Sequence, residues 1–344
     1  MKILHTLLIV PLWSIALLAN AGGQDSCTVK MAAKPMIDAR AQGAAGDGIT
    51  DDTKALQGAI DQASVAGGVV VVPDGVYLVD AVKGVRLKSD VVLKLSENAV
   101  IKAAPNGSTN YSILRIENAS NVAIIGGVLL GERYQHQGTK GEWGMGVSLA
   151  AATNIIIKNV VSKDNWGDGF YIGGNSKDVS FCSVVADGNR RQGMSIISGE
   201  NILVTGSSFI NTKGTAPQAG IDIEPDAKEM VRGVKIVNSK FWNNSGAGIA
   251  SYAAFGPAQV SIFDIEVNGN MVAENNNSGI SIFNTSLFRI IGNTLRGNRG
   301  NAIFMDDKTR AGLVRGNRVF HKGIFNESRI VDNGMNAVSD NYFD

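Results

Sequence analysis

Proline, cysteine and excess charge are all scarce in this chain of 344 residues. It has 7 prolines and 2 cysteines, and its 32 basic and 31 acidic residues leave a formal net charge of +1. Two cysteines do not build a disulfide scaffold, and a nearly neutral chain has nothing that steers it toward DNA or anionic lipid. We therefore expect no nucleic-acid partner. Glycine, in contrast, is frequent at 41 residues, which with so little proline indicates many tight turns.

A long apolar run stands at the N-terminus. Lys2 precedes an apolar stretch from Ile3 to Leu18, and the small residues Ala19-Asn20-Ala21 follow it. This arrangement predicts a cleavable signal peptide over residues 1–21, with a retained anchor as the less favoured alternative because the run is short for a bilayer span. The mature chain, residues 22–344, is then expected to be secreted or periplasmic, with no membrane contact after cleavage.

The two cysteines, Cys27 and Cys182, both belong to the mature chain. In an oxidising compartment they can pair. Cys182, however, lies in the apolar stretch DVSFCSVV, which favours a position in the core. The sequence leaves open whether the two form a disulfide.

A repeated glycine pattern dominates the chain from residue 140 onward. A glycine, replaced by alanine in the last copy, is followed by a hydrophobic residue, a variable residue and usually a second hydrophobic residue. The copies, spaced by 23 to 31 residues, begin at Gly146, Gly169, Gly193, Gly220, Gly248, Gly279 and Ala302. Between them lie short β-branched stretches such as NIIIKNVV, each running into a polar turn. Such a unit is one coil of a parallel β-solenoid, whereas a β-sandwich would not keep the glycine phase from coil to coil.

Asparagines recur at similar turn positions in the later coils, namely Asn238, Asn270, Asn293 and Asn317. Asparagine tolerates left-handed turn conformations and bonds to nearby backbone groups. We therefore predict a partial ladder in which each side-chain amide bonds to the backbone and to the asparagine one coil away. Their role is expected to be structural.

The N-terminal part follows a different pattern. The segment Thr50–Thr53 (TDDT) can cap a helix, and Gly67-Gly68 would end it before a buried strand at Val69–Val72. One face of this helix would carry Ala55, Leu56, Ala59, Ile60 and Ala63. Because the open end of a solenoid exposes core and strand edges, we expect this helix to cap it.

The same region carries a family resemblance. The stretch Ala44–Gln57 (AAGDGITDDTKALQ), followed by AIDQA and GGVVVVPDGVY, resembles the opening segment of the pectate-lyase-like superfamily, within it the rhamnogalacturonases, family-28-related hydrolases and alginate epimerases. The resemblance implies an all-β fold, a right-handed parallel β-helix (solenoid) with an N-terminal capping helix. Residues 22–344 would form one domain, with the cap and first strands at about 36–80 and the coils at about 81–344. Lyases, hydrolases, epimerases and phage tailspikes share this segment, so it does not choose a reaction.

Stacking the coils by their glycines places side chains in columns on one outer face. Alternation along each strand turns the second residue after each glycine outward, so this column is expected to face solvent. Its members are Ser148, Tyr171, Ser195, Asp222, Ala250, Ser281 and Phe304. With the neighbouring columns, the middle coils bring together Trp143, Trp166, Tyr171, Arg190, Asp222, Glu224 and Tyr252. Aromatic platforms beside carboxylates and an arginine suit sugars, so we predict a polysaccharide groove from Trp143 to Tyr252.

Asp222 and Glu224 are the predicted catalytic pair. They are two positions apart on a strand, so they point the same way, about 6–7 Å apart along the backbone. That approaches the roughly 6.5–9.5 Å at which an acid and a base flank a water in inverting glycosidases. Asp168, about 9–10 Å from Asp222 by strand spacing, is a second candidate partner. Asp226 is expected to be a turn residue, unless it helps to hold Ca²⁺; no motif supports calcium, and no other cofactor or metal is expected.

The polar and aromatic segment Gly131–Trp143 interrupts the repeat and is predicted to form a wall of the groove. Its candidate substrate-binding residues are Arg133, His136, Glu142 and Trp143. A histidine there can transfer protons because its ordinary pKa lies near neutrality. Arg190 and Arg191 project from the turn of the central coil, where they would form surface ion pairs or bind a carboxylate in bidentate fashion.

The favoured reaction is hydrolysis of a glycosidic bond in a polysaccharide, with Asp222 and Glu224 as acid and base. The alternative is β-elimination or epimerisation on a uronic-acid polymer, in which Arg190 or Arg133 offsets the carboxylate and Tyr171 or His136 removes the C5 proton. A third candidate is a non-catalytic glycan-binding solenoid. A monomer and a homotrimer are both open.

The signatures of the resembling families are only partly present. Family-28 hydrolases carry Asn-Thr-Asp, Gly-His-Gly and Arg-Ile-Lys on successive coils; here Asn211-Thr212 runs into a loop and the later signatures are missing. Gly220–Glu224 has the phase of the Gly-ϕ-Asp-Pro-His stretch of alginate epimerases but lacks the histidine. Each departure weakens the corresponding mechanism.

Overall fold

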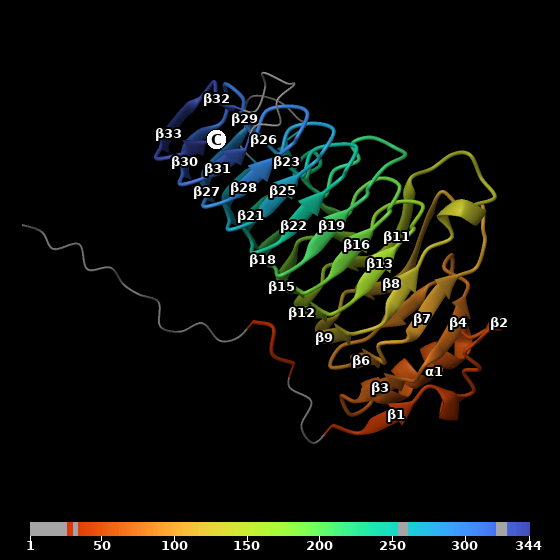
Figure 1. Ribbon diagram of the computed structural model, residues 1–344. Helices are drawn as coiled ribbons and strands as arrows, with labels where there is room; N and C mark the ends of the chain where they lie inside the picture. The colour runs from red at the N-terminus through yellow and green to blue at the C-terminus, as the bar shows by residue number, and fades with distance from the viewer. Residues whose placement is uncertain (1–25, 30–33, 254–260, 321–328) are drawn as a thin grey trace, which may run out of the picture.

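Three parallel sheets run side by side along the axis of a β-helix, and each takes one strand from successive coils (Figure 1). The structure is a computed structural model that describes residues 26–29, 34–253, 261–320 and 329–344. The predicted signal peptide lies outside these residues. The predicted all-β parallel β-helix is confirmed. No helix within the described ranges is long and apolar enough to cross a membrane.

We call the three sheets A, B and C. Sheet A contains, in spatial order, β1 (Met36–Asp38), β3 (Val69–Val72), β6 (Val92–Leu95), β9 (Ser120–Ile125), β12 (Thr153–Lys158), β15 (Ser176–Cys182), β18 (Gly199–Thr205), β21 (Val231–Val237), β24 (Ile262–Asn268), β27 (Thr285–Ile291), β30 (Arg310–Arg315) and β33 (Met335–Ser339). Sheet B contains β2 (Asp47–Asp51), β4 (Gly75–Val79), β7 (Ala99–Ala103), β10 (Val128–Leu130), β13 (Val161–Lys163), β16 (Val185–Asp187), β19 (Ser208–Ile210), β22 (Lys240–Trp242), β25 (Met271–Ala273), β28 (Thr294–Arg296), β31 (Arg318–Phe320) and β34 (Tyr342–Phe343). Sheet C contains β5 (Val85–Leu87), β8 (Asn110–Glu117), β11 (Trp143–Ala150), β14 (Phe170–Gly173), β17 (Met194–Ile196), β20 (Ile221–Ile223), β23 (Ile249–Tyr252), β26 (Ile280–Phe283), β29 (Ile303–Met305) and β32 (Ile330–Asp332).

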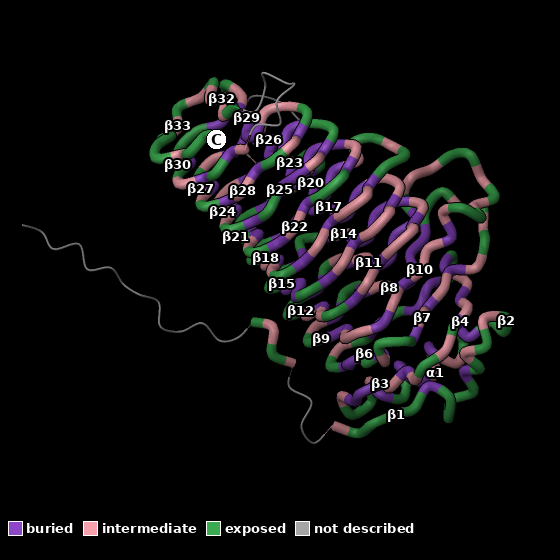
Figure 2. Tube along the Cα trace, viewed as in Figure 1, coloured by how far each residue is buried: buried purple, intermediate pink, exposed green. Residues whose placement is uncertain are grey.

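The core fills the space between the three sheets (Figure 2). The hydrophobic residue after each repeat glycine points inward and pairs in register with its counterpart on the next coil. This buried column consists of Val147, Phe170, Met194, Ile221, Ile249, Ile280 and Ile303. Each such side chain contributes about 1.5–3 kcal/mol when it is fully buried.

Close stacking of the coils explains why glycine precedes this column. A Cβ atom added to Gly193 would lie 2.4 Å from the carbonyl oxygen of Gly220, and one added to Gly220 would lie 2.5 Å from that of Gly248. Cβ atoms do not come this close to an atom to which they are not bonded, so each coil can approach the next only where the side chain is absent. Close packing of successive coils therefore requires the repeated glycine before each strand of sheet C.

Buried asparagine ladders bond successive turns together. In the predicted ladder, the Nδ2 of Asn270 and of Asn293 donate to the Oδ1 of the next member, at 3.0 and 2.9 Å, and the series runs on through Asn317. Asn238 is not part of it. Ser239 occupies the equivalent position and donates its N–H to Asn270, so that prediction was wrong by one residue. A second ladder, which the sequence reading missed, contains Asn244, Asn275 and Asn298.

Helix α1 (Thr53–Ser64) packs against β1, β3 and β5 at the N-terminal end of the β-helix, as predicted. Its cap differs from the expectation. Asp52 precedes the helix, but its carboxylate accepts the backbone N–H groups of Ala45 and Gly46 at 2.6 and 3.0 Å. Asp51 accepts the N–H of Thr53 at 3.0 Å instead. The acidic pair therefore ties the preceding turn to the start of the helix.

A disulfide joins Cys27 to Cys182, with the two Cα atoms 6.0 Å apart. Cys182 is also buried, so its two proposed roles are compatible. The bond holds residues 26–29 against sheet A, where Lys158 Nζ donates to the carbonyl oxygen of Cys27 at 3.1 Å. The segment therefore becomes part of the folded unit.

Breaking this disulfide should destabilise the protein. The cross-link spans 155 residues and restricts the unfolded chain over that length. We expect the double variant Cys27→Ser, Cys182→Ala to lose about 2–4 kcal/mol of unfolding free energy. Urea unfolding with and without reductant measures the loss. The double variant should not respond to reductant, and equal stability of the oxidised and reduced parent protein would contradict the prediction.

Candidate active site

The outward column predicted from the glycine spacing is the observed register of sheet C. Ser148 pairs with Tyr171, and the series continues through Ser195 and Asp222. Its remaining members are Ala250, Ser281 and Phe304. The predicted column is confirmed.

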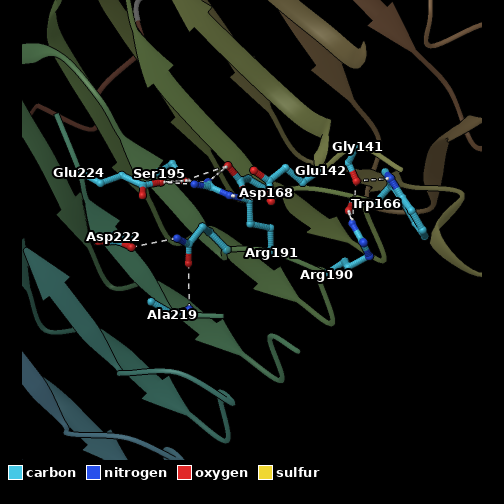
Figure 3. Close-up of polar contacts among 11 residues, drawn as sticks. Gly141, Glu142, Trp166, Asp168, Arg190, Arg191, Ser195, Ala219, Asp222 and Glu224 are labelled. Carbon is cyan, nitrogen blue, oxygen red and sulfur yellow. Dashed lines mark hydrogen bonds and ion pairs between the residues drawn. The ribbon is translucent and has the colours of Figure 1, made fainter. Parts of the chain in front are cut away.

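The exposure of this column differs from the expectation. Asp222 is 3% exposed and Ser195 is fully buried, although both point away from the core. Side chains from the turn before β17 cover them. Gln192 Nε2 donates to Asp222 Oδ2 at 2.9 Å, and Gln192 Oε1 accepts the N–H of Ala219 at 2.8 Å (Figure 3). The amide of Gln192 thus seals the carboxyl group of Asp222.

Arg191 lies at the centre of the acidic residues (Figure 3). Its Nη2 donates to Glu224 Oε1 at 2.6 Å, and its Nη1 lies 3.3 Å from Asp168 Oδ2. Ser195 Oγ accepts from Nη1 at 3.0 Å and donates to Asp168 Oδ2 at 2.8 Å. Glu142 Oε2 is farther away, 3.9 Å from Arg191 Nε. One guanidinium therefore lies close to carboxylates from three coils. Arg191 pairs with acids of the protein and does not project freely from the surface.

Burial favours the protonated form of two of these acids. Removal from water raises the pKa of Asp168 to about 7, against the opposing effects of Arg191 and the hydroxyl of Ser195. Burial and the nearby charge of Glu224 raise the pKa of Asp222 well above its ordinary value. The Oδ1 atoms of both aspartates have no hydrogen-bond partner among the described residues. The pKa of Arg191 is raised although burial opposes its charge, because Asp168, Glu224 and Glu142 surround it.

The three predicted catalytic acids therefore have different access to a ligand. The side chain of Glu224 is 19% exposed, whereas that of Asp168 is 0% exposed. Asp168 was expected as a possible partner of Asp222 in catalysis. Burial alone does not separate it from Asp222, which is 3% exposed; its bonds to Arg191 and Ser195 make Asp168 a positioning residue for the arginine.

Trp166 is enclosed between two side chains. The ring of His136 stacks on it at a centroid distance of 3.9 Å, and the Arg190 guanidinium lies 3.7 Å from its centroid. Trp166 Nε1 and Arg190 Nη1 both donate to the carbonyl oxygen of Gly141 at 3.1 Å. Trp166 was predicted to be a sugar platform and Arg190 a carboxylate ligand. The Arg190 guanidinium covers one face of the Trp166 ring, and both side chains donate to Gly141. They therefore hold the end of the wall segment next to Glu142.

His136 is buried beneath the wall segment. Its side chain is 1% exposed, and its Nδ1 lies 3.0 Å from Glu132 Oε1, which also accepts a hydrogen bond from Tyr111. Arg133 donates to the carbonyl oxygens of Gly188 and Lys213 at 2.5 and 2.6 Å. The structure therefore contradicts the placement of His136 and Arg133 on the open groove, since both anchor the wall to the coils.

Three other predicted residues remain accessible. Trp143 is 44% exposed, Tyr252 is 51% exposed and the side chain of Glu142 is 34% exposed. Tyr171 is partly buried, and burial together with the charges of Asp226 and Glu229 raises its pKa to about 12. Asp226 itself is exposed in the turn after β20. Within the described ranges, no group of three or more His, Cys, Asp or Glu side chains is arranged to hold a metal ion.

Sequence reasoning missed Gln192, Ser195, Glu132 and Tyr111 as members of the site. One signal for Gln192 was present. It stands directly before a repeat glycine, as Asp168 does, at a position that holds alanine before Gly220 and Gly248. A polar residue at this position can reach the outer face of sheet C, which is what both side chains do.

Replacing Trp166 by alanine should loosen the wall. The change removes the ring between His136 and Arg190 and the donor to Gly141, so we expect a loss of about 3–5 kcal/mol of unfolding free energy. We also expect weaker binding of any ligand that contacts Glu142. Thermal unfolding and ligand binding measure the two effects. Trp166→Phe keeps a ring but loses the indole donor, so it should fall between parent and alanine variant. An alanine variant as stable as the parent would refute this role of Trp166.

The fold and this site define the class of the molecule: a parallel β-helix with an arginine-centred acid cluster on the outer face of one sheet. Residues 36–250 match the family described as "Rhamnogalacturonase A/epimerase, pectate lyase-like", so the chain belongs to this family. The resemblance predicted from the segment after Ala44 is thereby confirmed.

The chain is similar to several other proteins and solved structures. "SPbeta prophage-derived uncharacterized protein YorA" of Bacillus subtilis (strain 168) is 26% identical over 316 residues, which cover 78% of this chain and 53% of that protein. The Azotobacter vinelandii mannuronan C-5 epimerase AlgE4 A-module superposes with a TM-score of 0.69 at 18% identity, covering 90% of this chain and 95% of that one. The exopolygalacturonase of Thermotoga maritima superposes with a TM-score of 0.66 at 14% identity, covering 92% and 94%. These structural likenesses show the fold. The chain spans about half the length, or less, of the first curated relatives it matches.

Proposed function

We propose that this protein is a carbohydrate-active enzyme that hydrolyses a glycosidic bond in a polysaccharide. One observation carries the proposal: a buried carboxyl group with a raised pKa, Asp222, stands two residues from a carboxylate bound by arginine, Glu224. Acid and base catalysis at one pH requires two such groups in different environments. The polysaccharide class is supported by the names of two structural relatives, a polygalacturonase and a mannuronan epimerase.

The two carboxyl groups have distinct roles in this mechanism. Asp222 protonates the leaving oxygen; Gln192 holds its Oδ2, and its Oδ1 is buried without a partner among the described residues, so substrate binding must displace the cover over this oxygen. Glu224, more accessible than Asp222, accepts a proton from the attacking water. Arg191 keeps Glu224 oriented and compensates the charge of the cluster. Asp168 and Ser195 fix Arg191 and do not contact the sugar in this scheme.

β-Elimination is the less supported reaction because its two predicted bases are poorly suited to it. A pKa of about 12 keeps the Tyr171 hydroxyl protonated at neutral pH. His136 lies buried between Trp166 and Glu132. Neither side chain is ready to remove a proton from a uronate C5 atom.

A polysaccharide panel tests the proposal. The protein is incubated with each polymer, and new reducing ends and the ultraviolet absorbance of unsaturated sugars are recorded. Reducing ends without absorbance support hydrolysis, both signals together support elimination, and binding without either signal would leave a glycan-binding solenoid. Asp222→Asn and Glu224→Gln should each abolish turnover, whereas Asp264→Asn, which changes an exposed acid on sheet A, should not.

We also propose that the mature protein is exported. The apolar N-terminal run suggests a signal peptide, and the Cys27–Cys182 disulfide fits an oxidising compartment. N-terminal sequencing of the protein recovered from the periplasm or medium should begin after Ala21. Recovery of the uncleaved chain from the cytoplasm would reject this localisation.

A further inference from the structure

Three aromatic rings follow one another along sheet C on the C-terminal side of the acid cluster. They are Tyr252 at the end of β23, Phe283 at the end of β26 and Phe304 in β29. The ring centroids of Tyr252 and Phe283 are 5.7 Å apart, and those of Phe283 and Phe304 are 5.2 Å apart. The three side chains thus form a continuous series, which we call the ring series.

The ring series lies on the outer surface of the β-helix. Tyr252 is 51% exposed, and Phe283 and Phe304 are partly exposed. Phe241, in contrast, points inward from sheet B and is fully buried. On the other side of the site, Trp166 has both faces covered by His136 and Arg190, whereas Trp143 is 44% exposed. Among the described residues, the ring series is therefore an accessible aromatic surface on the C-terminal side of the acid pair. Exposed rings that contact one another beside the proposed active site form a candidate binding surface.

The register connects the ring series to the acid pair. Ile223 pairs with Ser251, so Tyr252 stands one coil beyond Glu224. Ser251 in turn pairs with Ile282, which places Phe283 one coil farther. Phe304 belongs to the same outward column as Asp222. Adjacent strands are about 4.8 Å apart, a step close to the length of one sugar unit in an extended glycan. A chain lying over the acid pair would therefore meet a ring on each successive coil.

We propose that Tyr252, Phe283 and Phe304 are successive sugar-binding subsites. They bind the part of a glycan that extends from the acid pair toward the C-terminal end of the β-helix. The apolar C–H face of a pyranose packs on an aromatic face, while its hydroxyl groups stay in water. The ligand of this site is thus a polysaccharide or an oligosaccharide of several units, since a monosaccharide would reach only one ring. The position of the reacting bond rests on the proposed function, but the binding surface does not.

Chain-length dependence tests this inference. Oligogalacturonates and oligomannuronates from dimer to hexamer are titrated by calorimetry into Glu224→Gln protein, in which turnover does not consume the ligand. In this background the affinity should rise with chain length. Adding Tyr252→Ala or Phe283→Ala should weaken hexamer binding by roughly three- to tenfold per ring and leave dimer binding nearly unchanged.

Two further variants separate the site from general effects. Tyr252→Phe keeps the ring and should restore most of the affinity that Tyr252→Ala loses. Trp242→Ala removes an exposed ring on sheet B and should bind every oligomer as the background does. Hexamer binding that is unchanged in both alanine variants, or absent from the background protein for both probes, would overturn the ring series as this binding site.

The binding test of the ring series and the turnover test of the acid pair can fail independently of each other. If the ring variants lose length-dependent binding but Asp222→Asn still turns substrate over, the ring series stands and the catalytic assignment fails. If Asp222→Asn is inactive while the ring variants bind normally, the catalytic assignment stands and the ring series is wrong.

Discussion

Replacing Arg191 by alanine should abolish turnover and destabilise the protein by about 3–5 kcal/mol, because buried acids would lose the counter-charge that they share. In the native protein the guanidinium contacts Asp168 and Glu224 directly and lies 3.9 Å from Glu142. Its side chain is 11% exposed, so water does not replace it easily. Without it, the cluster must take up protons or open to solvent. Either response removes the orientation of Glu224 on which the proposed hydrolysis depends.

The pH dependence of this loss identifies its cause. Once Arg191 is gone, repulsion among the acids is relieved by protonation, so the difference in unfolding free energy between parent and variant should shrink as the pH falls. Urea titrations from pH 4 to pH 8 measure it, and Arg289→Ala, an exposed arginine paired with Asp264 and Glu266, is the control. Arg191→Lys keeps a charge but lacks the planar fork, so it should recover stability more than activity. A loss that is the same at every pH would show that Arg191 acts through packing instead.

Predictions that depend on the repeat succeeded because a solenoid is nearly one-dimensional. Each coil contacts the coils next to it, so the spacing of Gly193, Gly220 and Gly248 was enough to predict the register of sheet C. The same logic failed by one residue at Asn238, because Ser239 supplies a similar hydrogen bond from the ladder position. The spacing of the repeat does not reveal that a serine has taken the place of an asparagine at one turn.

The interior of the site could not be predicted in the same way. Alternation along a strand correctly turned Asp222 outward, but its burial depends on a side chain from the previous coil, that of Gln192. Trp166 and His136 were both predicted to belong to the groove, yet their stacking depends on how the wall segment folds back. Periodicity determines which face a residue occupies, whereas covering and stacking depend on side-chain conformations and on loops that interrupt the period.

Asp168→Asn should make the protein more stable at neutral pH while it lowers activity. Burial raises the pKa of Asp168 from its ordinary value of 3.8 to about 7. An acid whose pKa is higher in the folded state binds more protons there than in the unfolded chain, so its contribution to stability is full below pH 3.8 and is lost as the pH rises through about 7. A shift of this size corresponds to about 4 kcal/mol as an upper figure. Asparagine carries no charge at any of these pH values and removes this loss.

Unfolding free energies of the parent protein and Asp168→Asn, measured from pH 4 to pH 8, test this expectation. The two curves should lie close together at the acidic end and separate toward neutrality, with the variant above. Its amide oxygen can still accept from Ser195, but without the carboxylate Arg191 is held less firmly, so turnover should fall even where stability rises. Asp264→Asn, at an exposed position, should leave the shape of the parent curve unchanged. Parallel curves for Asp168→Asn and the parent would show that folding does not raise the pKa of Asp168, and would refute this prediction.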